Sequence, residues 1–281
     1  MLCDEKTVLE IVNFKGVAIG GESYSSFSSM LLHLFRDWSD SCKHVMRDVY
    51  GPIVGAVKEH VPVREGSEKG PSLLLPGAGL CRLGYELMCE GYDVECNEFS
   101  KVFVTLSDFI FNGCSQQLPI APLAHSFTEN RKLSDQYFEV DVPTPMPRTT
   151  ALEKDRTMRM TAGDVVSIYK AGGPGHRKFD GVVTCFFIDT GDDLIEYMRT
   201  IDQVLDEGGV WINYGPLNFK KDLRLKLTWE EIQEVWEHMG YEFLQVEQVH
   251  TSYNIEAGIK LYTERYDPMF TVARKLPKKA L

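Results

Sequence analysis

The sequence of 281 residues predicts an α/β protein with a Rossmann-like, mostly parallel sheet, preceded by a helical N-terminal extension. The first observation is a set of short apolar runs with the length of buried strands. They lie at residues 73–75, 92–96, 180–188 and 210–214. The second is that helical patterns separate these runs, as in βαβ units. The third is a glycine turn at residues 77–79, directly after the first run, where sheets of this class bind ligands.

The segment from residue 72 to residue 100 has the spacing of a nucleoside site. Gly77 and Gly79 form a turn between the first strand and an amphipathic helix that ends at Gly91. Glu98 ends the second strand, 21 positions after Gly77. Glycines let a ligand approach the backbone, and the acid can bond ribose hydroxyls. The alternative is an ordinary βαβ unit with a tight turn.

Arg82 distinguishes between two nucleoside cofactors. It stands where the dinucleotide pattern has its third glycine, which permits close helix–strand packing beside a pyrophosphate. We interpret this as evidence against NAD, and thus against a nicotinamide oxidoreductase. The substitution favours S-adenosylmethionine, an adenosine with a charged amino-acid tail and no pyrophosphate.

The N-terminal part is predicted to be helical. Residues 25–38 carry apolar side chains at helical spacing, and the same style continues over residues 40–57. The polar stretch at 64–70 serves as a linker, so we expect an extension at residues 1–70 and a sheet domain at residues 71–281.

The sheet domain continues the alternation. Helices are predicted at residues 100–112, 165–169, 193–205 and 228–239, and terminal strands at residues 243–249 and 270–273. Thr228 and Glu231 form a capping pattern at the start of the last helix. Residues 115–150 contain five prolines and no sustained period, so we expect an irregular loop of functional importance.

Three acids follow predicted strands or loop ends, where open α/β sheets bind ligands. They are Glu98, Asp164 and Asp189. Glu98 is the candidate ribose acid. Asp164 is open to bonding the adenine amino group or to capping a helix. Asp189 is open to acting on the substrate or to capping the helix that begins at Asp193.

Residues 36–39, Arg-Asp-Trp-Ser, combine a guanidinium, an acid and an aromatic ring. Such a set suits clamping a carboxylate. Spacing alone favours a surface ion pair beside a buried indole.

Composition limits the class of function. The net charge is −11, and no basic stretch precedes residues 274–279, so we expect no nucleic-acid partner. No apolar run approaches the ~18 residues of a membrane span. The seven cysteines form no Cys-x-x-Cys pair, so we expect no zinc ribbon and no other metal. Their odd number, without a signal-peptide pattern, indicates reduced thiols. We therefore expect a cytoplasmic protein, with the nucleus as a second location.

Taken together, several segments resemble the carnosine N-methyltransferase family, from about residue 32 to residue 275. The matching segments are residues 36–39, 76–80, 82–83, 91–92, 97–98, 160–164, 184–190 and 208–216. The resemblance implies a class I methyltransferase with a seven-stranded sheet, a C-terminal antiparallel hairpin and an extension over the cofactor. It also implies methyl transfer from S-adenosylmethionine to an imidazole ring nitrogen, with S-adenosylhomocysteine as product.

The resemblance assigns roles residue by residue. The implied cofactor residues are His33, Arg36, Gly77, Gly79, Glu98, Asp164, Val165 and Cys185. The implied substrate residues are Phe186, Asp189, Lys220 and Tyr266, with Asp189 holding the imidazole as the catalytic group. From strand geometry alone, Cys185 and Phe186 are more simply core residues.

The chain departs from the family at a few positions. The family has a glutamine at His33, a glycine at Cys81 and a substrate-contacting histidine at Lys220. A second family tyrosine corresponds to Glu264 or is displaced to Tyr262. The acceptor therefore stays open between a carnosine-like molecule, another small imidazole and a histidine in a peptide or protein. A silent cofactor-binding protein is the alternative to an enzyme, and a homodimer is an assembly that family members can form.

Overall fold

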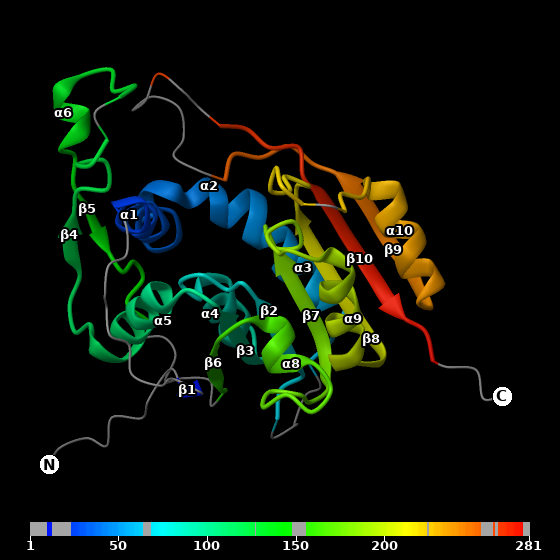
Figure 1. Ribbon diagram of the computed structural model, residues 1–281. Helices are drawn as coiled ribbons and strands as arrows, with labels where there is room; N and C mark the ends of the chain where they lie inside the picture. Colours follow the sequence, from blue (N-terminus) through cyan, green and yellow to red (C-terminus); the bar gives the residue numbers. More distant parts are fainter. Residues whose placement is uncertain are drawn as a thin grey trace, which may run out of the picture.

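The computed structural model describes residues 10–12, 24–63, 69–126, 128–147, 156–223, 225–253, 261 and 264–277. In these ranges the central sheet has eight strands in the order β1-β6-β3-β2-β7-β8-β10-β9 (Figure 1). They are β1 (Glu10–Val12), β2 (Ser72–Pro76), β3 (Asp93–Glu98), β6 (Met158–Ala162), β7 (Phe179–Cys185), β8 (Leu205–Gly215), β9 (Tyr241–Gln248) and β10 (Met269–Lys275). The first six in this order pair parallel, whereas β10 is antiparallel to both β8 and β9. The predicted mostly parallel sheet and its C-terminal antiparallel hairpin are confirmed, with eight described strands in place of the predicted seven.

Two strands go beyond the prediction. β1 lies inside the extension that the sequence predicts to be helical, and it pairs with β6 at the edge of the sheet. β6 was not predicted as a strand, because the exposed Arg159 interrupts its apolar run between the buried Met158 and Met160. Met158, Arg159 and Met160 alternate in burial as strand residues do, and the polar Thr161 that follows is also buried.

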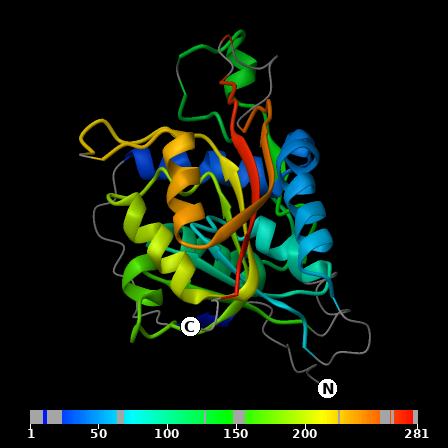
Figure 2. The ribbon, with the colours of Figure 1, turned by 90° about the vertical axis from the view of Figure 1, so that its right-hand side faces the viewer.

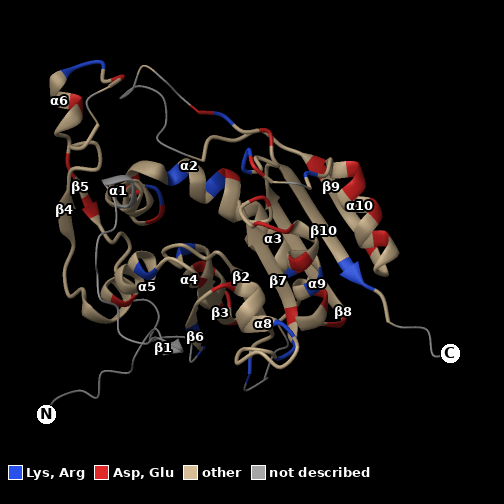
Figure 3. Ribbon diagram, viewed as in Figure 1, with Lys and Arg blue, Asp and Glu red and all other residues tan. Residues whose placement is uncertain are grey.

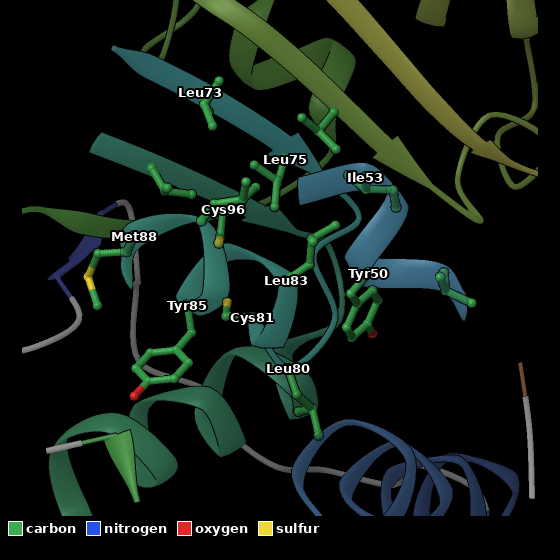
Figure 4. Packing of buried hydrophobic residues seen from close by; sticks show 14 of the residues in the cluster. Tyr50, Ile53, Leu73, Leu75, Leu80, Cys81, Leu83, Tyr85, Met88 and Cys96 are labelled. Carbon is green, nitrogen blue, oxygen red and sulfur yellow. The ribbon is translucent and has the colours of Figure 1, made fainter. Parts of the chain in front are cut away.

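Two helical layers enclose the sheet (Figure 2). One contains α1 (Tyr24–Trp38), η1 (Asp40–Cys42), α2 (Lys43–Val45), η2 (Met46–Tyr50), α3 (Gly51–His60), α4 (Arg82–Cys89), α5 (Lys101–Asp108) and η3 (Phe109–Gly113). The other contains α8 (Val165–Tyr169), α9 (Leu194–Val204) and α10 (Trp229–His238). Leu73 and Leu75 of β2 pack in the first layer and Leu74 in the second, because successive strand residues point to opposite faces. Figure 4 shows the first of these cores.

Part of the predicted irregular loop forms a small lobe. β4 (Leu118–Ile120) and β5 (Val140–Val142) pair antiparallel, and α6 (Leu133–Gln136) lies between them in sequence. The lobe stands out from the sheet domain at one end of the molecule (Figures 1 and 2).

Arg82 fastens the extension to the glycine turn. Its buried guanidinium donates to the carbonyls of Asp37 (2.8 Å) and Thr144 (2.9 Å). The Trp38 indole N–H donates to the Leu80 carbonyl at 3.1 Å. The end of α1 is thereby held against the turn that precedes α4. The predicted division at residue 70 stays a prediction, and these bonds cross it.

The acidic character of the chain shows on the outer surface. α10 carries four exposed glutamates, visible in Figure 3, at residues 230, 231, 234 and 237. None of the helices in the described ranges combines the length and the apolar content that a membrane span requires.

Candidate functional site

Two adjoining cavities lie where β2, β3 and β7 end. The larger has a volume of about 810 Å³ and the smaller about 220 Å³. Both are lined by His33, Gly77, Gly79 and Phe186. The larger is also lined by Glu98, Asp164, Val165 and Lys220, and the smaller by Arg36 and Cys185. The structure thus brings ten of the twelve predicted site residues to one continuous hollow.

The glycine turn has a backbone that only glycine adopts readily. Gly77 and Gly79 have φ angles of +63° and +56°. A Cβ at Gly77 would overlap the ring of Phe187, and one at Gly79 would lie 3.7 Å from His33 Nδ1. The bare backbone between these side chains therefore forms part of both cavity walls.

Glu98 is the buried acid at the end of β3. Its Oε2 accepts the N–H of Gly79 at 2.9 Å and its Oε1 that of Ser100 at 2.8 Å. Burial raises the pKa of this carboxyl, and the backbone donors partly oppose that shift. The Phe99 N–H is a third backbone donor to this carboxyl, which has about four acceptor positions, so about one position remains for a hydroxyl donor in the larger cavity.

The opposite wall of the larger cavity begins at Asp164. Its Oδ2 accepts the Ser167 N–H at 2.8 Å, so the helix-capping interpretation is right, and Asp164 also borders the cavity. Val165 lies beside it. Phe187 and Tyr197 complete this wall with parallel rings whose centroids lie 4.8 Å apart.

Arg36 lines the smaller cavity and forms an ion pair with the buried Asp37 behind it. Arg36 donates from Nε to Asp37 Oδ1 (2.6 Å) and from Nη2 to Asp37 Oδ2 (2.9 Å). Tyr50 donates its hydroxyl to the same carboxylate at 2.9 Å. Burial disfavours the Asp37 charge, yet the Arg36 guanidinium and these bonds outweigh it and hold the pKa of Asp37 below its usual value. Spacing alone favoured a surface pair, and this expectation is wrong, because α1 packs against the glycine turn.

His33 stands between Arg36 and the glycine turn. Arg36 Nη2 lies 2.9 Å from His33 Nδ1, and since a guanidinium only donates, Nδ1 accepts and the ring is neutral. Burial, together with the charge of Arg36, lowers the pKa of His33 to about 3. The ring also contacts Phe103, with centroids 4.5 Å apart.

We expect His33→Gln to reduce the fall in the free energy of unfolding as the pH drops below 7. The unfolded chain binds a proton on His33 below about pH 6.5, whereas the folded chain does so only near pH 3. The free energy of unfolding must therefore fall as the pH drops through this window. Since the side chain is 26% exposed, we expect wild type to lose about 1 kcal/mol more than the variant between pH 7 and pH 5. Urea unfolding of both proteins measures this; parallel profiles would contradict it.

Cys185 and Phe186 follow one another at the end of β7. Burial raises the pKa of the Cys185 thiol to about 12, so it stays protonated at neutral pH. Phe186 has a left-handed backbone with φ +51°, and its N–H donates to the Tyr214 carbonyl at 2.7 Å. This turn aims the Phe186 ring at both cavities, so it is more than a core residue.

The three remaining predicted substrate residues differ in how close they lie to the cavities. Asp189 is buried, accepts the Asn218 N–H at 2.6 Å and has a pKa raised by burial. It is absent from the described linings of both cavities. Lys220 borders the larger cavity and pairs with Asp192 at 2.9 Å, with both side chains exposed. Tyr266 lies edge-on to Phe186, with centroids 5.3 Å apart, and outside both linings. Tyr262 lies outside the described residues.

Sequence reasoning missed several aromatic residues of the hollow. Tyr50 and Tyr253 line the smaller cavity, and Phe103 and Tyr197 the larger. The Tyr253 ring lies 4.1 Å from the Arg36 guanidinium. No local pattern joins these positions, because they come from separate elements. Asp37 could be found from the sequence, because it lies within the Arg-Asp-Trp-Ser segment at residues 36–39.

The fold is that of the class I methyltransferases. The structure resembles a magnesium protoporphyrin IX methyltransferase from Synechocystis, crystallised with bound SAH, with a TM-score of 0.53 at 11% identity. That match covers 90% of this chain and 95% of the other. TehB from Haemophilus influenzae matches with a TM-score of 0.51 at 12% identity, over 87% and 67% of the two chains.

The chain belongs to the carnosine N-methyltransferase family. Residues 19–277 match this family. The carnosine N-methyltransferase of Mus musculus is 32% identical over 255 residues, which are 88% of this chain and 62% of the mouse protein. That of Schizosaccharomyces pombe is 33% identical over 242 residues, 80% of this chain and 64% of the relative. The chain thus spans less than two thirds of these curated relatives.

Proposed function

We propose that the chain transfers a methyl group from S-adenosylmethionine to an imidazole ring nitrogen of a carnosine-like, histidine-containing small molecule. The observation that carries this proposal is the joint placement of Gly77, Gly79 and Glu98 around one hollow in a member of this family. Transfer to a small imidazole follows from the family, and the structure supplies a site of fitting shape and charge.

The residues present fit the donor. Glu98 keeps about one acceptor position for a ribose hydroxyl, and the glycine backbone admits a close ligand. Five carboxylates and two lysines line the larger cavity: Glu98, Asp164, Asp192, Asp193, Glu196, Lys170 and Lys220. This excess of negative charge suits a cationic sulfonium. Arg36 is placed to receive a carboxylate in the smaller cavity.

The chain's own groups orient the reactants and hold a proton. When bound, the sulfonium supplies the methyl group that an in-line displacement moves to a nitrogen lone pair. The glycine turn, Glu98 and the aromatic walls hold the donor and exclude water. The family resemblance gives Asp189 the role of accepting the N–H of the nonreacting ring nitrogen, which would fix the tautomer and favour the imidazolium that forms. For this contact the acceptor has to reach beyond the two described cavity linings, which do not include the Asp189 side chain.

Asp189→Asn should separate binding from turnover. An amide removes the negative charge but keeps the size of the side chain, and Asp189 lies outside the described cavity linings. We expect unchanged cofactor affinity by calorimetry and about 100-fold slower methyl transfer to carnosine. Full activity of the variant would remove Asp189 from the chemistry.

A panel experiment tests the proposed function. In thermal unfolding, S-adenosylhomocysteine should raise the melting temperature of the protein, whereas NAD should leave it unchanged. Labelled S-adenosylmethionine is then incubated with carnosine, histidine, other imidazole dipeptides and a histidine-containing peptide. Transfer to carnosine or a small relative supports the proposal. Transfer to the peptide alone would replace the acceptor class, and a thermal response without any transfer would favour a silent binding protein.

Three further properties belong to the proposal. We infer that the chain acts on its acceptor without a nucleic-acid partner, because its charge is strongly negative. The reduced cysteines support a cytoplasmic or nuclear location. A homodimer rests on the family alone, and size-exclusion chromatography with light scattering tests it.

A further inference from the structure

An aromatic side chain rests on the face of Phe186. The rings of Phe186 and Tyr253 lie parallel, with 4° between their planes and 3.8 Å between their centroids. Aromatic side-chain pairs prefer offset or edge-on contacts with centroids roughly 4.5–7 Å apart. The Phe186–Tyr253 pair is therefore more directly superposed than side-chain pairs prefer, and its geometry is that of one flat ring covering another.

The backbone of Phe186 is held in place by its neighbours, which fixes the position of its ring. Its left-handed backbone is anchored by the 2.7 Å bond to the Tyr214 carbonyl. A Cβ at Gly215 would lie 3.2 Å from the Cα of Phe186, so the two backbones are closely packed. Tyr266 closes one side of the ring, with an angle of 87° between the two planes. If the two stacked rings separate, we therefore expect the Tyr253 ring to move and the Phe186 ring to stay in place.

Tyr253 lies on an arm that continues the pairing of β9 with β10. Thr251 and Tyr266 form the last described pair, joined by N–H···O bonds of 3.0 and 2.8 Å. Tyr253 stands two residues beyond Thr251. Its ring covers both Phe186 and the Arg36 guanidinium and borders the smaller cavity. Displacement of this ring would uncover the Phe186 face at the point where the two cavities meet.

We propose that Tyr253 is a placeholder for the methyl acceptor, whose ring replaces the tyrosine ring on Phe186 during turnover. This rests on the proposed function and specifies the acceptor further. The position takes a flat aromatic ring, because both neighbouring surfaces are flat. The nearby Arg36 disfavours a cationic ring, so the acceptor enters neutral, which is also the form with a free lone pair. Tyr253 is a positioning residue in this scheme.

Binding of the bare ring tests the placeholder. Imidazole and carnosine are titrated by NMR into the full chain saturated with S-adenosylhomocysteine, at about pH 8, where the ring is neutral. Tyr253→Ala removes the competing ring, so we expect imidazole to bind about two- to tenfold more tightly. Tyr253→Phe keeps the competing ring and should bind like wild type. The Ser252 hydroxyl, on the same arm, donates to the Glu264 carbonyl at 3.3 Å and does not line either cavity, so Ser252→Ala should also bind like wild type.

Unchanged or weaker imidazole binding in Tyr253→Ala would overturn the placeholder. If the alanine variant does not fold, Tyr253→Leu repeats the test, because leucine keeps apolar volume without a flat ring. Failure of the proposed function is distinguishable from this outcome. In that case wild type itself would bind no S-adenosylhomocysteine or transfer no methyl group, whereas failure of the placeholder alone leaves wild-type transfer intact.

Discussion

Gly77→Ala is expected to abolish productive binding of the cofactor. The new Cβ would overlap the ring of Phe187, which is stacked on Tyr197 in the wall of the larger cavity. The ring must move into that cavity or the turn must open, and either change disturbs the surface against which the donor lies. We expect the affinity for S-adenosylhomocysteine to fall about 100-fold, equivalent to about 2.7 kcal/mol. Isothermal titration calorimetry measures it.

Gly208→Ala is the matched control for backbone strain. Gly208 has a φ of +79°, similar to that of Gly77, but no atom lies within 4 Å of an added Cβ. Both substitutions therefore carry the cost of a left-handed residue, roughly 1–2 kcal/mol, and only Gly77→Ala adds a collision. Equal cofactor affinity in the two variants would show that the Phe187 contact does not shape the site.

Asp37→Ala is expected to have the largest effect on stability. It leaves the Arg36 guanidinium buried without its counter-charge and removes the acceptor of the Tyr50 hydroxyl. Breaking a buried pair in this way costs about 3–5 kcal/mol of unfolding free energy. Urea unfolding without cofactor gives the value. Replacing Arg36 and Asp37 together by leucine should cost less than Asp37→Ala alone, because no charge is then stranded.

Asp48→Ala provides the comparison for that prediction. Arg47 and Asp48 are also sequence neighbours with two bonds, at 2.6 and 2.7 Å, but their side chains are 73% and 36% exposed. The Asp37 side chain is 3% exposed. An exposed pair contributes at most about 1 kcal/mol, so Asp48→Ala should change little. A similar loss in the two alanine variants would mean that burial does not set the strength of the Arg36–Asp37 pair.

The placement of the glycine turn and Glu98 at one cavity was predictable because its signals are local. Gly77, Gly79 and Glu98 lie within one βαβ unit, whose geometry fixes their spacing in space as well as in sequence. Asp164 shows the limit of such reasoning. Capping and site roles were treated as alternatives, yet the residue caps α8 with one oxygen and borders the cavity as well.

The smaller cavity depends on contacts that no local pattern encodes. Tyr50 and Tyr253 meet at Arg36, although about 200 positions separate them. The placement of Tyr253 follows from the pairing of Thr251 with Tyr266, which the chain makes only after the hairpin has formed. The burial of the Arg36–Asp37 pair likewise depends on how α1 docks, which its own sequence does not specify.

The bonds from Arg82 and Trp38 hold α1 against the glycine turn, so the docking of this helix affects how tightly the site binds a ligand. If the proposed donor contacts Arg36 and His33, it resists the undocking of α1, so occupancy should slow local opening of this helix. Conversely, any change that loosens this helix reduces the fraction of molecules ready to bind. Protease cleavage within α1 should therefore become slower as the cofactor site fills.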